Sequence, residues 1–213
     1  MVRRFVPAAL WTALLAAAGI FLAGCGETES DAARIERLRQ QGDVAALERE
    51  ADGPNAPTAA AAVGALGSCG ARAVPRVEQA LADTRPQVRE EAALAYGRIA
   101  DDKQLARLAT MAREDKADTV RAAAVTALGE ARAVNQMEAL MRAAEDPDRL
   151  VRQRASDAMA RIMGRRYELY VDGTPDQRHD AVAKLRLAWP DMEATVRNYY
   201  KQLRSRQPEA AKH

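Results

Sequence analysis

A repeated pattern in the middle of this 213-residue chain constrains its fold more than any other feature. Three copies begin at Asp83, Asp115 and Asp146, so that they lie 32 and 31 residues apart. In each copy a Val lies five residues after the Asp, an Arg lies six residues after it, and an Ala lies three residues after the Arg. A period of this length is typical of solenoids, in which each unit buries its apolar face against its neighbours.

The composition predicts that these units are helical. Hydrophobic residues make up 48% of the chain but aromatic residues only 4%, so Ala and Leu supply most of the apolar side chains. Ala, Leu, Arg and Glu are strong helix formers, whereas strands prefer β-branched and aromatic residues. We therefore predict an all-α fold: an α-solenoid of about five helical hairpins with capping helices at its N- and C-terminal ends.

The spacing inside one unit predicts how its second helix packs. Val88, Ala92 and Ala95 are four and three residues apart and so share one helical face. Small Ala side chains at such a contact let neighbouring helices approach closely. The same register in the next copy places Ala124 in the helix contact and Ala122 on the exposed side. Glycines are expected at helix ends, where the left-handed conformation is tolerated: Gly97, Gly129 and Gly164.

Two degenerate copies flank the three clear ones. The segment from Asp172 keeps the spacing but has Gln177 in place of the Val, and the segment from Asp52 lacks the Val-Arg pair. Decay at the ends is typical of terminal capping repeats. A domain over 31–205 is therefore predicted, with repeats over about 43–70, 71–101, 102–131, 132–164 and 165–188, a cap helix over 190–205 after Pro190, and a flexible tail over 206–213.

The pattern resembles the HEAT-repeat family, especially the short bacterial HEAT-like units that also occur in phycobilin lyases. The resemblance covers about residues 43–188. It implies that the Asp and Arg positions bond across turns and between adjacent repeats, which we favour over a stripe of arginines for acidic ligands. The predicted structural ladder consists of Asp83, Arg89, Asp115, Arg121, Asp146 and Arg152.

The N-terminus carries a predicted targeting signal over 1–24. Two arginines precede an uncharged apolar run over 5–24 that ends in the sequence LAGC. A run of this length is also long enough for an uncleaved membrane helix. The LAGC ending, however, resembles the lipobox of bacterial lipoproteins. The resemblance implies export, cleavage before Cys25, acylation of its sulfur and of its new amino group, and a short tether over 25–30. Two or more acyl chains, such as palmitate, give stable membrane attachment.

Charge and motif content exclude several classes of function. Without the two signal arginines the chain has 30 basic and 30 acidic residues, so the processed body is neutral and nucleic acid is not an expected partner. His179 and His213 are the two histidines, which are too few for a metal site. Both lie far along the chain from the lone internal cysteine, Cys69, so a base beside its thiol is not expected. With no phosphate loop or nucleophile elbow either, we predict no catalytic residue, no cofactor and no metal.

The C-terminal part differs in composition from the rest. From residue 161 onward there are 11 basic and 7 acidic residues, together with five of the six aromatic residues that follow the signal. Tyr and Arg are enriched in binding hot spots, which makes Tyr167, Tyr170, Arg197 and Tyr200 candidates for partner binding. The favoured alternative is a cap, because Met192, Val196, Tyr199 and Leu203 form an amphipathic helical stripe.

Together these patterns predict a lipid-anchored scaffold for protein–protein interaction at a bacterial envelope membrane. Its attachment to the membrane is expected through Cys25, and its protein partner is not identified by the sequence. The alternative is a HEAT-like enzyme of the phycobilin-lyase type. The favoured prediction is a protein that is not an enzyme, since the repeats hold packing residues and no catalytic constellation.

Overall fold

A computed structural model describes residues 29–206 of the chain. The chain divides into two units, Met1–Ser30 and Asp31–His213, and the fold below is that of the second unit. Over the described residues every regular element is a helix, which confirms the predicted all-α solenoid. The predicted signal over 1–24, Cys25 and the tail after residue 206 lie outside the described residues.

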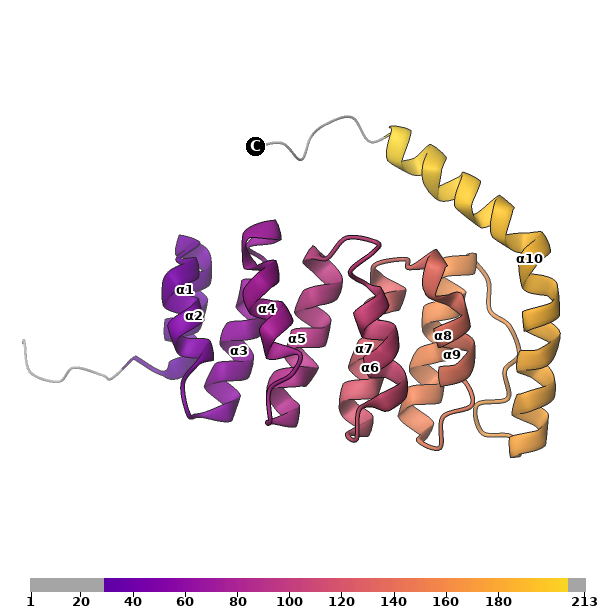
Figure 1. Ribbon diagram of the computed structural model, residues 1–213, viewed down its shortest axis with the longest axis horizontal. Coiled ribbons are helices and arrows are strands. Elements are labelled where there is room, and N and C mark those ends of the chain that lie inside the picture. The colour runs from indigo at the N-terminus through magenta and orange to yellow at the C-terminus, as the bar shows by residue number, and fades with distance from the viewer. Residues whose placement is uncertain (1–28, 207–213) are drawn as a thin grey trace, which may run out of the picture. The chain divides into compact units, whose positions relative to one another are not determined.

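The described helices follow one another as a series of hairpins (Figure 1). They are α1 (Asp31–Gln41), α2 (Val44–Ala51), α3 (Ala56–Leu66), the 3-10 helix η1 (Gly70–Ala73), α4 (Val74–Ala80), α5 (Pro86–Ile99), α6 (Ala106–Glu114), α7 (Asp118–Glu130), η2 (Val134–Gln136), α8 (Met137–Ala143), α9 (Arg149–Met163) and α10 (Pro175–Arg206).

The hairpins stack into two layers of helices. An inner layer consists of α3, α5, α7 and α9, each of which packs against the next. An outer layer consists of α2, α4, α6 and α8, each of which packs against the inner helix of its own hairpin. At the N-terminal end α1 covers α2 and α3, and at the C-terminal end α10 packs against α8 (Figure 1).

The core lies between the two layers and between successive inner helices. Val88, Ala92 and Ala95 are fully buried on α5, as their spacing predicts. Ala124 is also fully buried, but Ala122 is only 4% exposed, so the prediction that Ala122 faces solvent is wrong. The reason is that α7 has neighbours on three sides, α5, α6 and α9, which cover more of its circumference than a single hairpin partner does.

Gly97 and Gly129 lie in the last turns of α5 and α7, as predicted, but neither adopts the left-handed conformation. Both are contact points between inner helices. A Cβ atom added to Gly97 would lie 2.7 Å from the Cβ of Ala127, and one added to Gly129 would lie 2.6 Å from the Cβ of Ala158. Gly164 does adopt the left-handed conformation, with φ 72°, and ends α9.

The C-terminal end departs from the hairpin pattern. The part of the predicted repeat 165–188 that precedes α10 contains no helix, so this unit has one helix where the others have two. The predicted break at Pro190 is also absent from the described structure, because α10 continues through that residue. Proline lacks the N–H of a helical hydrogen bond and bends a helix without always ending it. α10 accordingly bends along its length (Figure 1).

Candidate functional site

The Asp and Arg positions of the central repeats form two bidentate ion pairs. Arg89 on α5 donates from Nε and Nη2 to the carboxylate of Asp115, over 2.8 and 2.9 Å. Arg121 on α7 makes the same pair of bonds to Asp146, over 2.9 and 3.0 Å. Each pair joins an inner helix to the turn before the next inner helix, so the bonds run from one repeat to the following one.

The same side chains also hold the turn of their own repeat. The Nη1 of Arg89 donates to the carbonyl oxygen of Asp83 over 2.8 Å, and that of Arg121 to the carbonyl oxygen of Asp115 over 3.0 Å. The Asp115 carboxylate accepts the backbone N–H of Ala117 as well, over 3.0 Å. The same Arg and Asp side chains therefore stabilise a tight turn within a repeat and also link that repeat to its neighbour.

At the two ends of the ladder the partners change. The Asp83 carboxylate pairs with Arg85, two residues away, because the preceding repeat has no Arg at the matching position. Arg152 donates to the carbonyl oxygens of Asp146 and Val171, over 2.9 and 2.8 Å. Of the six residues predicted for the ladder, four thus form ion pairs between repeats, whereas Asp83 and Arg152 bond to other groups.

The burial and the electrostatics of the central ion pairs both indicate a structural role for them. The side chains of Arg89 and Asp115 are only 16% and 10% exposed. Burial opposes ionisation of Asp115, but hydrogen bonds from Arg89 and from the Ala117 backbone outweigh it and lower the pKa of its carboxyl group. The hydrogen bond to Asp115 in turn raises the pKa of Arg89. Each of the two side chains therefore stabilises the charged form of the other.

On α10 the structure reverses the predicted orientations of Tyr199 and Tyr200. The Tyr200 hydroxyl donates to the carbonyl oxygens of Ile162 and Arg161 at the end of α9, over 2.9 and 3.1 Å. The Arg132 guanidinium lies 5.3 Å from its ring centre. Burial raises the pKa of Tyr200. Tyr199, which the stripe placed inward, is 57% exposed. Tyr200 therefore fastens the C-terminal part of α10 to the preceding repeat.

The remaining candidates divide between packing and exposure. Tyr167 packs partly buried, with its hydroxyl 3.1 Å from the Met192 sulfur on α10. Tyr170 is 43% exposed, and Arg197 forms an ion pair with Glu193 one turn earlier on α10. Tyr167 and Tyr200 thus position α10, whereas Tyr170 and Arg197 reach the surface.

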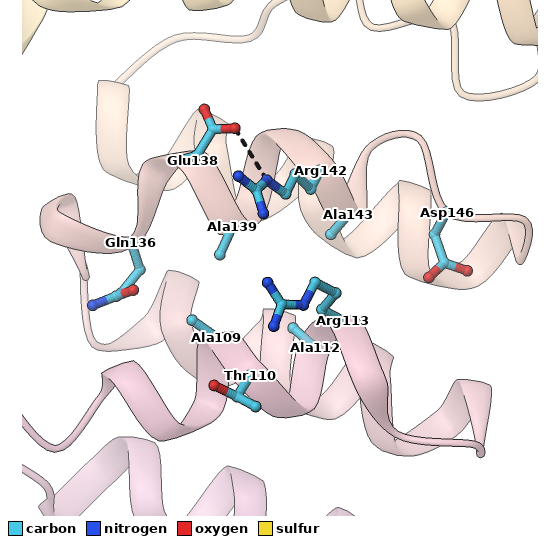
Figure 2. Close-up of a pocket in the computed structure, with 10 residues that line it drawn as sticks. All are labelled: Ala109, Thr110, Ala112, Arg113, Gln136, Glu138, Ala139, Arg142, Ala143 and Asp146. Carbon is cyan, nitrogen blue, oxygen red and sulfur yellow. Dashed lines mark hydrogen bonds and ion pairs between the residues drawn. The ribbon is translucent and has the colours of Figure 1, made fainter.

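A groove of about 290 Å³ runs between α6 and α8 in the outer layer, and we call it the outer groove. Figure 2 shows Arg142 on one side of the groove and Arg113 on the other, with alanines contributed by both sides. Each of these arginines has a carboxylate partner: Arg113 pairs with the adjacent Glu114, and Arg142 pairs with Glu138 over 3.1 Å. Both arginines thus already have a carboxylate partner, although Glu138 also pairs with Arg186.

A second hollow, of about 490 Å³, lies on the exposed side of α7 and α9. We call it the arginine hollow; its lining includes Thr126, Gly129, Arg154, Asp157, Arg161 and Arg166. None of these arginines was predicted as a site residue. Arg161 and Arg166 belong to the excess of basic residues from residue 161 onward, whereas no sequence signal marks Arg154. Three cations and one carboxylate give this hollow a net positive charge.

Comparisons with known proteins found similarity to a family model and to a solved structure. Residues 44–129 match the family model of HEAT repeats. The similarity to HEAT repeats thus covers part of the solenoid, from residue 44 to residue 129. A chain in the structure of the complex of CpcE and CpcF of phycocyanin lyase from Nostoc sp. PCC7120 is 20% identical, with a TM-score of 0.48, and the match covers 72% of this chain and 97% of that one. Curated proteins gave no match.

The matched part of the HEAT-like domain runs from α2 to α7, so α8, α9 and α10 lie beyond it. The arginines of the arginine hollow belong to this C-terminal remainder. Over residues 29–206, no cluster of three or more His, Cys, Asp or Glu side chains is suited to hold a metal ion. Over the same residues, no helix is both long and apolar enough to cross a membrane.

Proposed function

We propose that this protein is a lipid-anchored scaffold, without enzymatic activity, that binds other proteins at a bacterial envelope membrane. The observation that carries the proposal is the stack of HEAT-like hairpins, in which the repeated residues serve packing. A solenoid of this kind presents an extended surface to partners, because each repeat adds one helix to the inner layer and one to the outer layer.

The ion pairs support this reading of the repeats. The charges of Arg89, Asp115, Arg121 and Asp146 satisfy one another and neighbouring backbone groups. A buried charge that has its partner in the chain is not available to a substrate or ligand. The surface between and beside the helices is then the part of the domain that meets other molecules.

The anchor in this proposal is the lipidated Cys25. The tether from Gly26 to Ser30 spans at most about 18 Å when extended, at about 3.6 Å per residue, so the first helices would stay close to the membrane. The α10 end of the solenoid is separated from α1 by four stacked hairpins. A domain held in this way has its C-terminal repeats available to neighbouring proteins.

Metabolic labelling with an alkyne fatty acid, followed by chemical cross-linking in intact cells, tests both halves of the proposal. The expected result is label on the wild-type chain, none on Cys25→Ser, and a defined set of proteins cross-linked to the wild type. Label retained on Cys25→Ser would contradict the anchor. A purified chain that carries a bound tetrapyrrole, or that yields no cross-linked protein, would contradict the scaffold.

A further inference from the structure

We propose that the arginine hollow binds an acidic segment of a partner protein, an inference that rests on the proposed scaffold function and gives its partner a chemistry. The hollow brings together side chains that are far apart in sequence: Thr126 and Gly129 from α7, Arg154 and Arg161 from α9, and Arg166 from the segment after α9. The hollow forms where two repeats stack, and neither repeat contains it alone.

Two of the three arginines of the hollow have no carboxylate of a described residue within hydrogen-bond distance. Arg154 is exposed, and no hydrogen bond or ion pair joins its side chain to another described residue. Arg161 has one carboxylate, that of Glu130, at 3.7 Å, which is too long for a hydrogen bond. Arg166 is paired with Asp157 over 3.1 Å but is 73% exposed. Arg154 and Arg161 thus keep their donors available to a ligand.

The shape of the hollow suits a polypeptide segment. Its lining includes Gly129 and Ala158, which pack so closely that a Cβ on Gly129 would lie 2.6 Å from the Ala158 Cβ. These two residues have little or no side chain, whereas the long side chains of Arg154 and Arg161 line the same hollow. These two are seven residues apart on α9 and so lie on one helical face, two turns apart. Successive carboxylates of an extended or helical segment can reach both of them.

Carboxylates are the groups that this arrangement recognises best. The guanidinium group offers a planar fork of donors that matches a carboxylate in bidentate geometry, as Arg89 and Asp115 show elsewhere in this chain. The hollow is also local: a duplex nucleic acid or a flat anionic membrane needs a wide basic surface, whereas the processed chain has equal numbers of basic and acidic residues. An acidic peptide fits its size and its charge.

The outer groove provides a charge-matched control. Arg113 and Arg142 also line a hollow between two repeats, but each already has a glutamate partner (Figure 2). Replacing them removes the same formal charge as replacing Arg154 and Arg161. A difference between the two double variants therefore reports the site and not the net charge of the protein.

The test uses detergent-solubilised full-length protein and a short fluorescein-labelled peptide that alternates Glu and Ala, followed by fluorescence anisotropy. We expect the wild type to bind this peptide, and not its Gln counterpart, with an affinity that falls as salt rises. Arg154→Ala with Arg161→Ala should weaken binding by roughly tenfold or more, since two charge-assisted contacts are lost. Arg113→Ala with Arg142→Ala should change it by less than about twofold, in keeping with exposed, already paired charges.

Several results would overturn the inference. Equal losses in the two double variants would mean general charge attraction, and unchanged binding in the first would place the contact elsewhere. Binding of phosphatidylglycerol vesicles through Arg154 and Arg161, without peptide binding, would assign the hollow to lipid. Thermal melts check folding, with Arg154→Gln and Arg161→Gln as milder replacements. Cross-linked partners that persist in the Arg154 and Arg161 variant would refute this site while leaving the scaffold function intact.

Discussion

Arg121 and Arg152 hold equivalent positions in successive repeats, yet only one of them meets a carboxylate in the next repeat. Both donate from Nη1 to the carbonyl oxygen of the residue six positions earlier. Arg121 then makes two bonds to the carboxylate of Asp146, whereas Arg152 makes one bond to the carbonyl oxygen of Val171. The contact inside a repeat depends on local spacing alone, whereas the contact between repeats depends on what the next turn presents.

The turn after α9 presents a different group because the segment before α10 is not helical. In the central repeats a short outer helix leads into the turn and places its Asp carboxylate beneath the preceding Arg. Before α10 the chain instead offers the Val171 carbonyl, and the neighbouring Asp172 pairs with the exposed Arg149 over 2.6 Å. The end of the ladder thus coincides with the end of the hairpin pattern, at the C-terminal edge of the stack.

The largest expected effect separates a central pair from its terminal counterpart. Asp115→Ala leaves the Arg89 charge largely buried without its partner, which should lower the free energy of unfolding by about 3 kcal/mol. Asp172→Ala removes one half of an exposed pair and should leave stability nearly unchanged. Urea unfolding followed by circular dichroism measures both. Equal losses of stability in the two variants would mean that the central pair and its terminal counterpart are not distinct.

The acid dependence of the same pair should follow from its electrostatics. Because the pKa of Asp115 is lowered in the folded state, its stabilising contribution is present above the unfolded pKa of about 3.9 and is lost as the pH falls through the folded value. Asp115→Asn lacks this contribution at every pH. The stability gap between wild type and Asp115→Asn should therefore narrow from pH 6 to about pH 2 in urea melts, and a constant gap would contradict this account.

A smaller effect tests whether close helix packing joins the repeats together with the ion pairs. Gly129→Ala forces a methyl group against Ala158 and should cost about 1–3 kcal/mol, even though Ala is the better helix former. Gly64→Ala is the matched control, because its new methyl group would meet only the flexible end of the Glu91 side chain, at 3.0 Å. That change should be neutral or stabilise by up to about 1 kcal/mol. Thermal melts that rank the two variants the other way would refute the packing assignment.

The smallest predicted effect concerns the attachment of α10. Tyr200→Phe removes the hydroxyl that bonds to the last carbonyl groups of α9 and should loosen the C-terminal part of α10 by about 1 kcal/mol. Hydrogen exchange should rise in the residues after Pro190 and stay unchanged in α5 and α7. Tyr199→Phe, at an exposed ring, serves as the control and should leave exchange as in the wild type. Faster exchange throughout the domain would show that α10 is not a separable end.

The sequence alone was sufficient for the fold class and for much of the inner layer. The period of 32 and 31 residues, the scarcity of aromatic residues and the spacing of Val88, Ala92 and Ala95 each report local helical geometry, which does not depend on distant contacts. The burial and contacts of positions that have neighbours in two other repeats could not be predicted from the sequence. Ala122 and Gly129 look like an exposed residue and a helix end within one repeat, and become contacts only when α7 lies between α5 and α9.

The sequence by itself determined the repeats, their helical character and the bonds that each arginine makes within its own turn, because all of these follow from spacing along one chain segment. Only the tertiary structure decided which carboxylate each arginine meets, that α10 continues through Pro190, and that Tyr200 and not Tyr199 faces the body. It also assembled Arg154, Arg161 and Thr126 around one hollow. These outcomes depend on the distance and rotation between neighbouring helices, which are set by the summed packing of both layers and are not encoded at any single position.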